Sequence, residues 1–136
     1  AMLAAPLIIG SDVPGMTPEI TAILANKRLI AINQDPLGRG AMKWIATPDW
    51  EIWAKPLTDG EWAIAMLNRG DEAQSISIDW AAVELKDDTF GHRAEFAQRS
   101  YTLTDAWSGK AAGDTRTALT SKVAPRDTAV FRLRPI

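Results

Sequence analysis

Apolar side chains are spaced differently before and after residue 40, and the two patterns predict different structures. Residues 7–9 form an apolar run without polar alternation, which is typical of a parallel strand that is covered on both faces. Thr17 then suits a helix N-cap, and Pro18 suits the first helical position. Apolar residues recur after it at i, i+3 and i+4: Ile20, Ile23 and Leu24. The pattern therefore predicts an amphipathic helix after the strand.

A second helix is predicted over residues 28–34, and Asp35-Pro36 would end it. Its apolar side chains would pack inward: Leu29, Ile30 and Ile32. Residues 1–40 thus have the pattern of one strand–helix unit of an α/β fold. Because a parallel strand needs neighbours and cover on both faces, we expect further chain to precede residue 1.

Short strands separated by turns replace the helical signals from about Ala41. Asp59-Gly60 is a strong hairpin signal, and the polar stretch 86–93 is interpreted as a longer loop. Ile76, Ile78 and Trp80 alternate with polar residues along one predicted strand. Strands are predicted over residues 42–47, 50–56, 61–68, 75–80, 100–107, 116–122 and 128–134. About seven or eight short strands with regular turns predict an antiparallel β-sandwich over residues 41–136.

The composition excludes several classes of function. The 136 residues are 46% hydrophobic and 24% charged, which suits a globular domain. Fifteen Lys and Arg against 17 Asp and Glu argue against a nucleic-acid binder or a membrane-surface module, since both need a concentrated basic face. The absence of cysteine excludes a disulfide scaffold, a thiolate zinc site and a cysteine nucleophile. The single histidine, His92, argues against a polyhistidine metal site and is interpreted as an exposed loop residue.

Six tryptophans are the most unusual feature of the composition. They are Trp44, Trp50, Trp53, Trp62, Trp80 and Trp107. Exposed rings could form a sugar-stacking platform, whereas buried rings would pack in the core or at a domain interface. Trp62 and Trp80 share strand faces with aliphatic residues, which favours packing, and the spacing of Trp50 and Trp53 places them on opposite faces of a strand.

Four acidic residues are candidates for a pair of catalytic carboxylates. Glycosidic chemistry needs two carboxyl groups about 5–9.5 Å apart across a bound sugar. Asp87, Asp88 and Glu95 lie in or near the polar stretch, where adjacent acids are more often solvated, and Asp12 follows the first predicted strand, where capping is the favoured role. The tripeptide 69–71, Arg-Gly-Asp, is interpreted as a turn between strands.

Several stretches match one known family. The most specific is Ile30 to Gly38, which also has the family's spacing after residues 17–19. Further matching stretches are residues 1–12, 52–57, 63–69, 105–110 and 123–133. Together they resemble family-27 glycoside hydrolases, a family that includes α-galactosidases and α-N-acetylgalactosaminidases. The resemblance covers essentially the whole chain and is weakest between Val83 and Gln98, where it indicates an insertion.

The resemblance implies a fold and a supporting role. Members are retaining glycosidases whose two catalytic aspartates lie on earlier strands of a (β/α)8 barrel. None of the family's catalytic or sugar-contacting motifs matches a position here, so no catalytic, substrate-binding or metal residue and no cofactor is expected. The expected fold is mainly β: residues 1–40 are the last β/α unit of the barrel and residues 41–136 are the antiparallel β-sandwich. The chain would be a non-catalytic part that supports an N-terminal catalytic barrel hydrolysing terminal α-galactosides.

The resemblance to the family also implies which partners the chain has. The expected partners are the catalytic barrel and carbohydrate, with no nucleic acid and no membrane. The lack of cysteine departs from disulfide-bearing eukaryotic relatives and indicates a bacterial parent. The localisation stays open, with a secreted or periplasmic parent as one alternative. Two alternatives stay open: a stand-alone carbohydrate-binding sandwich that uses its tryptophans, and an enzyme that uses Asp12 or the Asp87/Asp88 pair.

Overall fold

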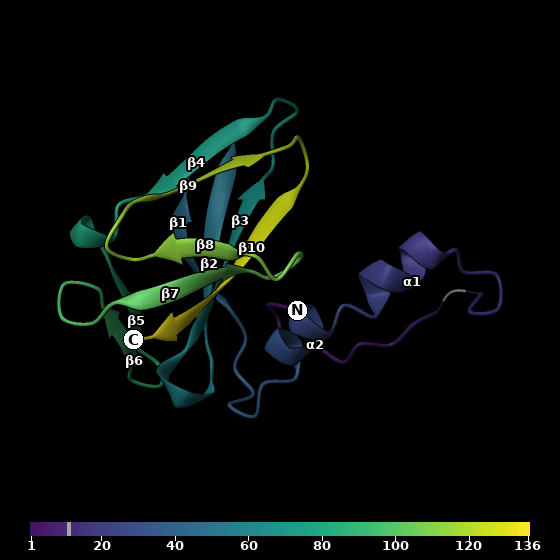
Figure 1. Cartoon of the computed structure of the whole chain (residues 1–136), viewed down its shortest axis with the longest axis horizontal. Coiled ribbons are helices and arrows are strands. Elements are labelled where there is room, and N and C mark those ends of the chain that lie inside the picture. Colours follow the sequence, from purple (N-terminus) through teal and green to yellow (C-terminus); the bar gives the residue numbers. More distant parts are fainter. Residues whose placement is uncertain (11) are drawn as a thin grey trace.

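A six-stranded antiparallel sheet with cover on both faces organises the chain (Figure 1). The computed structural model describes residues 1–10 and 12–136, so Ser11 of the matching stretch 1–12 lies outside the described residues. The helices are α1 (Pro18–Leu24) and α2 (Lys27–Asn33), with 3-10 turns η1 (Thr58–Gly60) and η2 (Trp80–Ala82). The strands are β1 (Met42–Ala46), β2 (Trp50–Pro56), β3 (Trp62–Asn68), β4 (Gln74–Ile78), β5 (Glu84–Asp87), β6 (His92–Glu95), β7 (Tyr101–Asp105), β8 (Ala111–Asp114), β9 (Leu119–Val123) and β10 (Thr128–Pro135).

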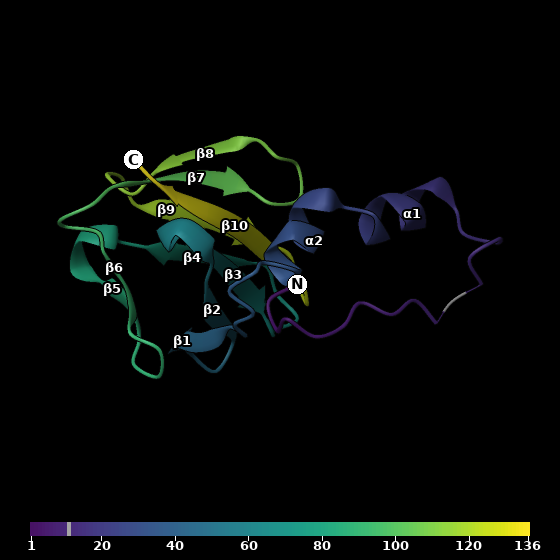
Figure 2. The same cartoon turned by 90° about the horizontal axis from the view of Figure 1, so that it is seen from below.

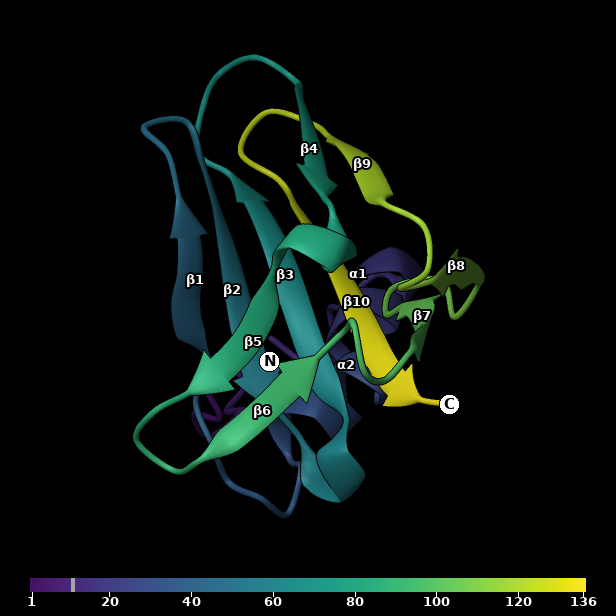
Figure 3. The same ribbon diagram turned by 90° about the vertical axis from the view of Figure 1, so that its left-hand side faces the viewer.

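The large sheet has the order β1-β2-β3-β10-β7-β8 and forms the middle layer. Two smaller antiparallel pairs, β4–β9 and β5–β6, lie against one of its faces, and α2 lies against the other (Figure 3). We name these two surfaces of the large sheet the core face and the helix face. The predicted antiparallel sandwich is therefore confirmed, with α2 as additional cover on its outer side.

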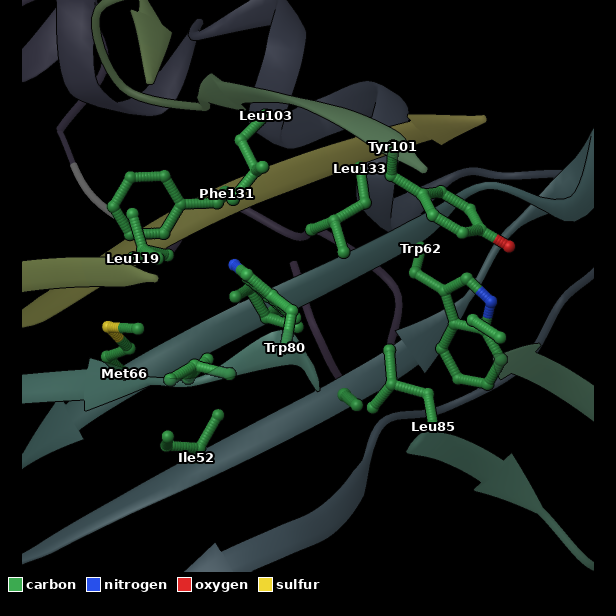
Figure 4. Close-up of a cluster of buried hydrophobic side chains, with 14 of the residues drawn as sticks. Ile52, Trp62, Met66, Trp80, Leu85, Tyr101, Leu103, Leu119, Phe131 and Leu133 are labelled. Carbon is green, nitrogen blue, oxygen red and sulfur yellow. The ribbon is translucent and has the colours of Figure 1, made fainter. Parts of the chain in front are cut away.

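The core face is filled by aliphatic and aromatic side chains from all three sheets (Figure 4). Alternation along β3 sends Trp62, Ile64 and Met66 to this face, where each is at most 1% exposed. Trp80 is equally buried, although it lies in η2 rather than in the strand that the alternation predicted. Its ring meets Phe96 edge-on with centroids 4.7 Å apart. The prediction that Trp62 and Trp80 are core residues is confirmed.

The helix face carries smaller side chains. Ala63 and Ala65 of β3 are buried there, together with Val130 of β10 and Ile32 of α2. Alanine at these positions leaves room for the side chains of α2, such as Ile32, to pack against the sheet. Trp53 packs at the edge of this cluster, whereas Trp50 packs against the core face, as their spacing predicted.

A buried lysine joins α2 to the sheet. Lys55 of β2 has no exposed surface, and its Nζ donates to the carbonyl oxygens of Ile32 and Asn33 at the end of α2. The carbonyls of a last helical turn have no partner within the helix, so the ammonium group satisfies them. Burial lowers the pKa of Lys55, and the nearby Asp35 carboxylate opposes this effect. Asp35 in turn accepts from the backbone and side chain of Thr58.

Local sequence signals account for several boundaries. Thr17 caps α1, since its Oγ1 accepts from the backbone N–H of Ile20 at 3.3 Å. Asn26 caps α2 by accepting from two backbone N–H groups. Asp59 and Gly60 both have positive φ, 61° and 72°, so the hairpin turn predicted before β3 is confirmed.

One prediction in the first half of the chain is wrong in the structure. Residues 7–9 form no strand, because no strand within residues 1–10 and 12–136 lies beside them to pair with them. The predicted amphipathic helix is present as α1, and its apolar stripe, which includes Ile23 and Leu24, is exposed. Of the strand and two helices predicted for residues 1–40, the two helices therefore form and the strand does not.

Two further corrections concern the sandwich. Residues 86–93 are not a loop, because β5 and β6 form a hairpin in which Leu85 and Ala94 lie opposite each other and are buried. His92 consequently lies in β6 and is half-buried, not in an exposed loop.

The guanidinium of Arg39 stacks on the ring of Phe90 at the hairpin tip, 3.3 Å from its centroid. Strand β8 was not predicted, since Ala-Ala-Gly-Asp carries no apolar alternation.

Replacing Lys55 with methionine should loosen α2. The change keeps the length of the side chain but leaves the carbonyls of Ile32 and Asn33 without their donor, which costs about 1–3 kcal/mol of unfolding free energy. Hydrogen exchange should show faster exchange in α2 and unchanged protection in β3. Lys122→Met, at an exposed position of β9, is the matched control. Unchanged exchange in α2 would contradict the anchoring role.

Candidate functional site

The most conspicuous surface of the molecule is apolar and uncovered. α1 and the N-terminal stretch extend beyond the sheets (Figures 1 and 2). Their large apolar side chains are between 42% and 86% exposed, the latter at Ile8. The members of this surface, which we name the apolar face, are Leu3, Leu7, Ile8, Ile9, Val13, Ile20, Ile23, Leu24 and Trp107. Several of them line one hollow together, among them Leu7, Leu24 and Trp107, and grouped exposed apolar side chains of this kind mark an interaction site.

A hollow of about 420 Å³ lies between the apolar face and the helix face of the sheet. Leu7, Leu24 and Trp107 line its outer part, and Ala65 and Val130 line its floor. An adjoining hollow of about 280 Å³ opens over Trp53 and Leu67. None of the described residues that line either hollow has a titratable side chain. The lining is mostly apolar and suits apolar side chains of a partner.

Glu51 orients Trp53 beside this site. The Glu51 carboxylate is 5% exposed and accepts from Trp53 Nε1, Lys43 Nζ and Arg69 Nη1, each at 2.9 Å. The hydrogen bond from Lys43, followed by that from Trp53, lowers the pKa of Glu51 below its usual value. The indole thus lies against the helix face with its N–H already paired, and only its apolar surface is available to a partner.

The predicted acidic candidates are not brought together as a site. Asp12 is exposed and does not cap α1, because Thr17 has that role; the backbone oxygen of Asp12 accepts from Gly15 instead. Asp87 accepts from the N–H of Thr89 in the turn after β5. Asp88 is 74% exposed and pairs with Lys86 Nζ at 2.6 Å. Glu95 accepts from the side chain of Gln98 three residues away. Each of these side chains serves a local turn or a surface pair.

The Arg-Gly-Asp tripeptide and the tryptophans also have structural roles. Arg69 pairs with Glu51, and Asp71 pairs with Arg126 across the loop between β3 and β4, so the turn interpretation is confirmed. Trp44 Nε1 donates to the carbonyl of Glu84 and holds the outer layer to β1. Among the six tryptophans only Trp107 is strongly exposed, and no platform of exposed indoles forms in the part of the chain that the structure describes.

Sequence reasoning missed the buried polar residues of the helix face. Lys55, Glu51 and Asp35 are ordinary charged residues in the sequence, and only their burial reveals their roles. Over residues 1–10 and 12–136, no three or more His, Asp or Glu side chains group closely enough to hold a metal ion. In the same residues, neither helix has the length and apolar character needed to cross a membrane.

Comparisons with known proteins agree with this architecture. The family model of the α-galactosidase C-terminal β-sandwich domain matches residues 47–133. The chain is 42% identical over 135 residues to α-galactosidase A of Cellvibrio japonicus, covering 99% of this chain and 33% of that protein. It is 36% identical over 144 residues to probable α-galactosidase B of Penicillium simplicissimum, covering 96% of this chain and 31% of that protein. The chain thus spans about a third of the length of these relatives.

Solved structures give the same result. A putative α-galactosidase/melibiase from Bacteroides fragilis has a TM-score of 0.75 and 36% identity, covering 98% of this chain and 26% of that chain. The α-galactosidase of Saccharomyces cerevisiae with raffinose has a TM-score of 0.82 over 100% of this chain and 41% of that chain; at 20% identity this likeness is one of fold. The resemblance stated from the sequence motifs is confirmed.

Acid should weaken the chain through Glu51. A carboxyl whose folded-state pKa is lowered stabilises the fold above its unfolded pKa of about 4.3, and that contribution is lost as pH falls through the folded pKa. Glu51→Gln should therefore be less stable than the unaltered chain at pH 7, and the difference should shrink between pH 5 and pH 3. Urea unfolding across this range measures it, with the exposed Glu84→Gln as control. A difference that is constant with pH would argue against an ionised, hydrogen-bonded Glu51.

Proposed function

The chain belongs to the family of α-galactosidase C-terminal β-sandwich domains, and we propose on this basis that it is the non-catalytic, supporting part of an α-galactosidase-like retaining glycoside hydrolase. The whole protein hydrolyses terminal α-galactosides, and this chain contributes none of the reacting groups. Its partner is the catalytic (β/α)8 barrel, which docks on the apolar face.

The uncovered apolar face is the observation that carries the proposal. Fully burying one Leu or Ile side chain contributes about 1.5–3 kcal/mol, and about half of that is available from a side chain that is half exposed. Leu7, Ile8 and Ile9 alone thus offer several kcal/mol to a partner that covers them. A barrel in the same polypeptide would pay little of the entropy cost of association, because the two parts are already linked.

The division of the chain is part of the proposal. Residues 1–40 are the last strand–helix unit of the barrel, and residues 41–136 are the sandwich. Residues 7–9 become a strand when the neighbouring barrel strands pair with them, and α1 then covers that strand from outside. The length of the matched relatives supports this arrangement, since they are about three times as long as this chain and have room for the rest of a barrel.

Complex formation tests the proposal directly. The 136-residue chain is co-expressed with the part of the Cellvibrio japonicus α-galactosidase A that lies outside the match. A complex that elutes as one species in size-exclusion chromatography and hydrolyses a chromogenic α-galactoside is expected, with no hydrolysis by this chain alone. Leu24→Glu should weaken the complex at least about tenfold, because docking would bury a charge. Phe90→Glu, which alters an exposed apolar residue on the β5–β6 hairpin, should not.

Two results would contradict the proposal. One is the absence of any complex when both parts are folded by circular dichroism. The other is hydrolysis by the chain alone that is abolished by Asp12→Asn or Asp87→Asn, since the reacting groups would then lie within these 136 residues.

Hydrogen exchange should locate the strand that forms on docking. In the free chain the amides of residues 7–9 have no backbone partner among residues 1–10 and 12–136, so we expect fast exchange there. In the complex they should become protected, whereas β10 should be protected in both states. Hydrogen exchange measured by mass spectrometry on peptides that contain residues 7–9 compares the free chain with the complex. Strong protection in the free chain would mean that a second copy already covers the segment.

A further inference from the structure

An arginine-lined hollow of about 300 Å³ lies beside the apolar face, between α2 and the sheet. Three of its walls are basic: Arg28 comes from α2, and Arg132 and Arg134 come from β10. Thr104 and Gly109 complete the polar part of the lining. We name this feature the arginine hollow. Neither its charge nor its position is explained by the supporting role alone.

Strand alternation places two of the arginines. Phe131 and Leu133 point to the core face, so Arg132 and Arg134 point to the helix face. Arg132 lies opposite Ala63 on one side and Thr104 on the other. These small neighbours leave open space around the guanidinium groups.

One acid partly balances the three arginines. The Glu61 side chain is 16% exposed; its Oε2 accepts from Arg132 Nε at 2.5 Å, and its Oε1 forms an ion pair with Arg134 Nε at 3.2 Å. Both arginines use only their Nε in these contacts. Within residues 1–10 and 12–136, the terminal nitrogens of Arg132 and Arg134 have no hydrogen-bond partner. Three guanidinium groups and one carboxylate leave an excess of about two positive charges around the hollow.

Arg28 is held in place by the turn after β7. Its Nε donates to the carbonyl of Ala106 at 3.1 Å, and a terminal nitrogen donates to the carbonyl of Trp107. Gly109 in this turn has φ +76°, and a Cβ there would lie 3.2 Å from the guanidinium carbon of Arg28. A side chain at this position would therefore be strained by its backbone angle and would also crowd the arginine.

The same turn connects the arginine hollow to the apolar face. Ala106 and Gly109 line the hollow, while Trp107 between them lines the apolar hollow. A partner that covers Trp107 is therefore adjacent to Arg28, whose guanidinium bonds the carbonyl of Trp107 and lines the same hollow as Arg134. The apolar area and the positive charge belong to one continuous surface.

We propose that the arginine hollow receives a carboxylate side chain from the domain that docks on the apolar face, an inference that rests on the proposed function. The planar guanidinium fork matches a carboxylate with two parallel N–H···O bonds. A positive excess beside an apolar docking surface selects a partner with negative charge at the matching position. Glu61 aligns Arg132 and Arg134 and leaves their outer nitrogens for the incoming acid.

The test uses the two-part complex described above. Arg134→Met removes an exposed guanidinium and keeps the apolar stem, and Arg116→Met, at a similarly exposed arginine beside β8, is the matched control. The dissociation constant is measured by titration at 50 and 500 mM NaCl. Arg134→Met should raise it about tenfold at low salt and much less at high salt, while Arg116→Met should change it less than twofold. Urea unfolding of the free variants checks that both remain folded.

The outcomes separate this inference from the proposed function. A complex that forms with the unaltered chain but is indifferent to Arg134→Met at both salt concentrations overturns the inference and leaves the supporting role standing. Failure of the unaltered chain to form a complex overturns both. Saturable shifts of the arginine side-chain NMR signals by inorganic phosphate in the free chain, without any effect of Arg134→Met on the complex, would assign the hollow to a free anion and overturn the carboxylate. Rescue of Arg134→Glu by one acid-to-lysine change in the partner would identify the carboxylate and support it.

Discussion

Two-sided packing of the central strands is the constraint on which the rest of the structure depends. β3 and β10 lie in the middle of the large sheet, so every second side chain must suit one of two different neighbours. On the core face the neighbours are the smaller sheets, and large residues such as Trp62 and Phe131 fill the space. On the helix face the neighbour is a helix, and alanines let it approach. A one-residue shift in register would exchange these two sets and destroy both contacts.

Polar groups on the helix face act where apolar packing ends. Lys55 satisfies the last carbonyls of α2, and Glu51 fixes Trp53. Both side chains are almost completely buried, so each is stabilising only because its hydrogen bonds are complete. Together they hold α2 and an indole in fixed positions beside the apolar face. These two elements are thus in place before any partner binds, which lowers the cost of ordering them on binding.

A supporting domain of this kind is expected to show little chemistry of its own. The acids considered as a catalytic pair, Asp87 and Asp88, serve a turn and a surface ion pair, and the described residues that line the hollow next to its apolar face carry no titratable side chain. The unbalanced charge lies in the arginine hollow, at the margin of the apolar surface. In an interface of two domains, apolar area supplies most of the free energy, and charges at the margin determine orientation. The apolar face and the arginine hollow at its margin are arranged in this way.

Much of the sandwich was predictable from the sequence, because its signals are local. The strand boundaries of β2 and β3, the cap at Thr17 and the turn at Asp59-Gly60 each follow from a few neighbouring residues. The alternation in β4 likewise predicts which side chains are buried. The motif at residues 30–38 identified the family, although it contains no reacting group.

The remaining features were decided by tertiary contacts. Residues 7–9 have the composition of a strand but form none, because pairing needs a neighbouring strand, and the described part of the chain places none beside them. β5 and β6 look like a polar loop, yet one buried residue in each, Leu85 and Ala94, is enough when the large sheet lies beneath them. The roles of Lys55 and of the arginine hollow cannot be predicted from the sequence, since a lysine or arginine at these strand positions is ordinarily expected to be exposed to solvent. The sequence by itself determined the local elements and the family. Only the three-dimensional structure decided which charges are buried and which apolar residues remain uncovered, because both depend on contacts between residues far apart in the chain.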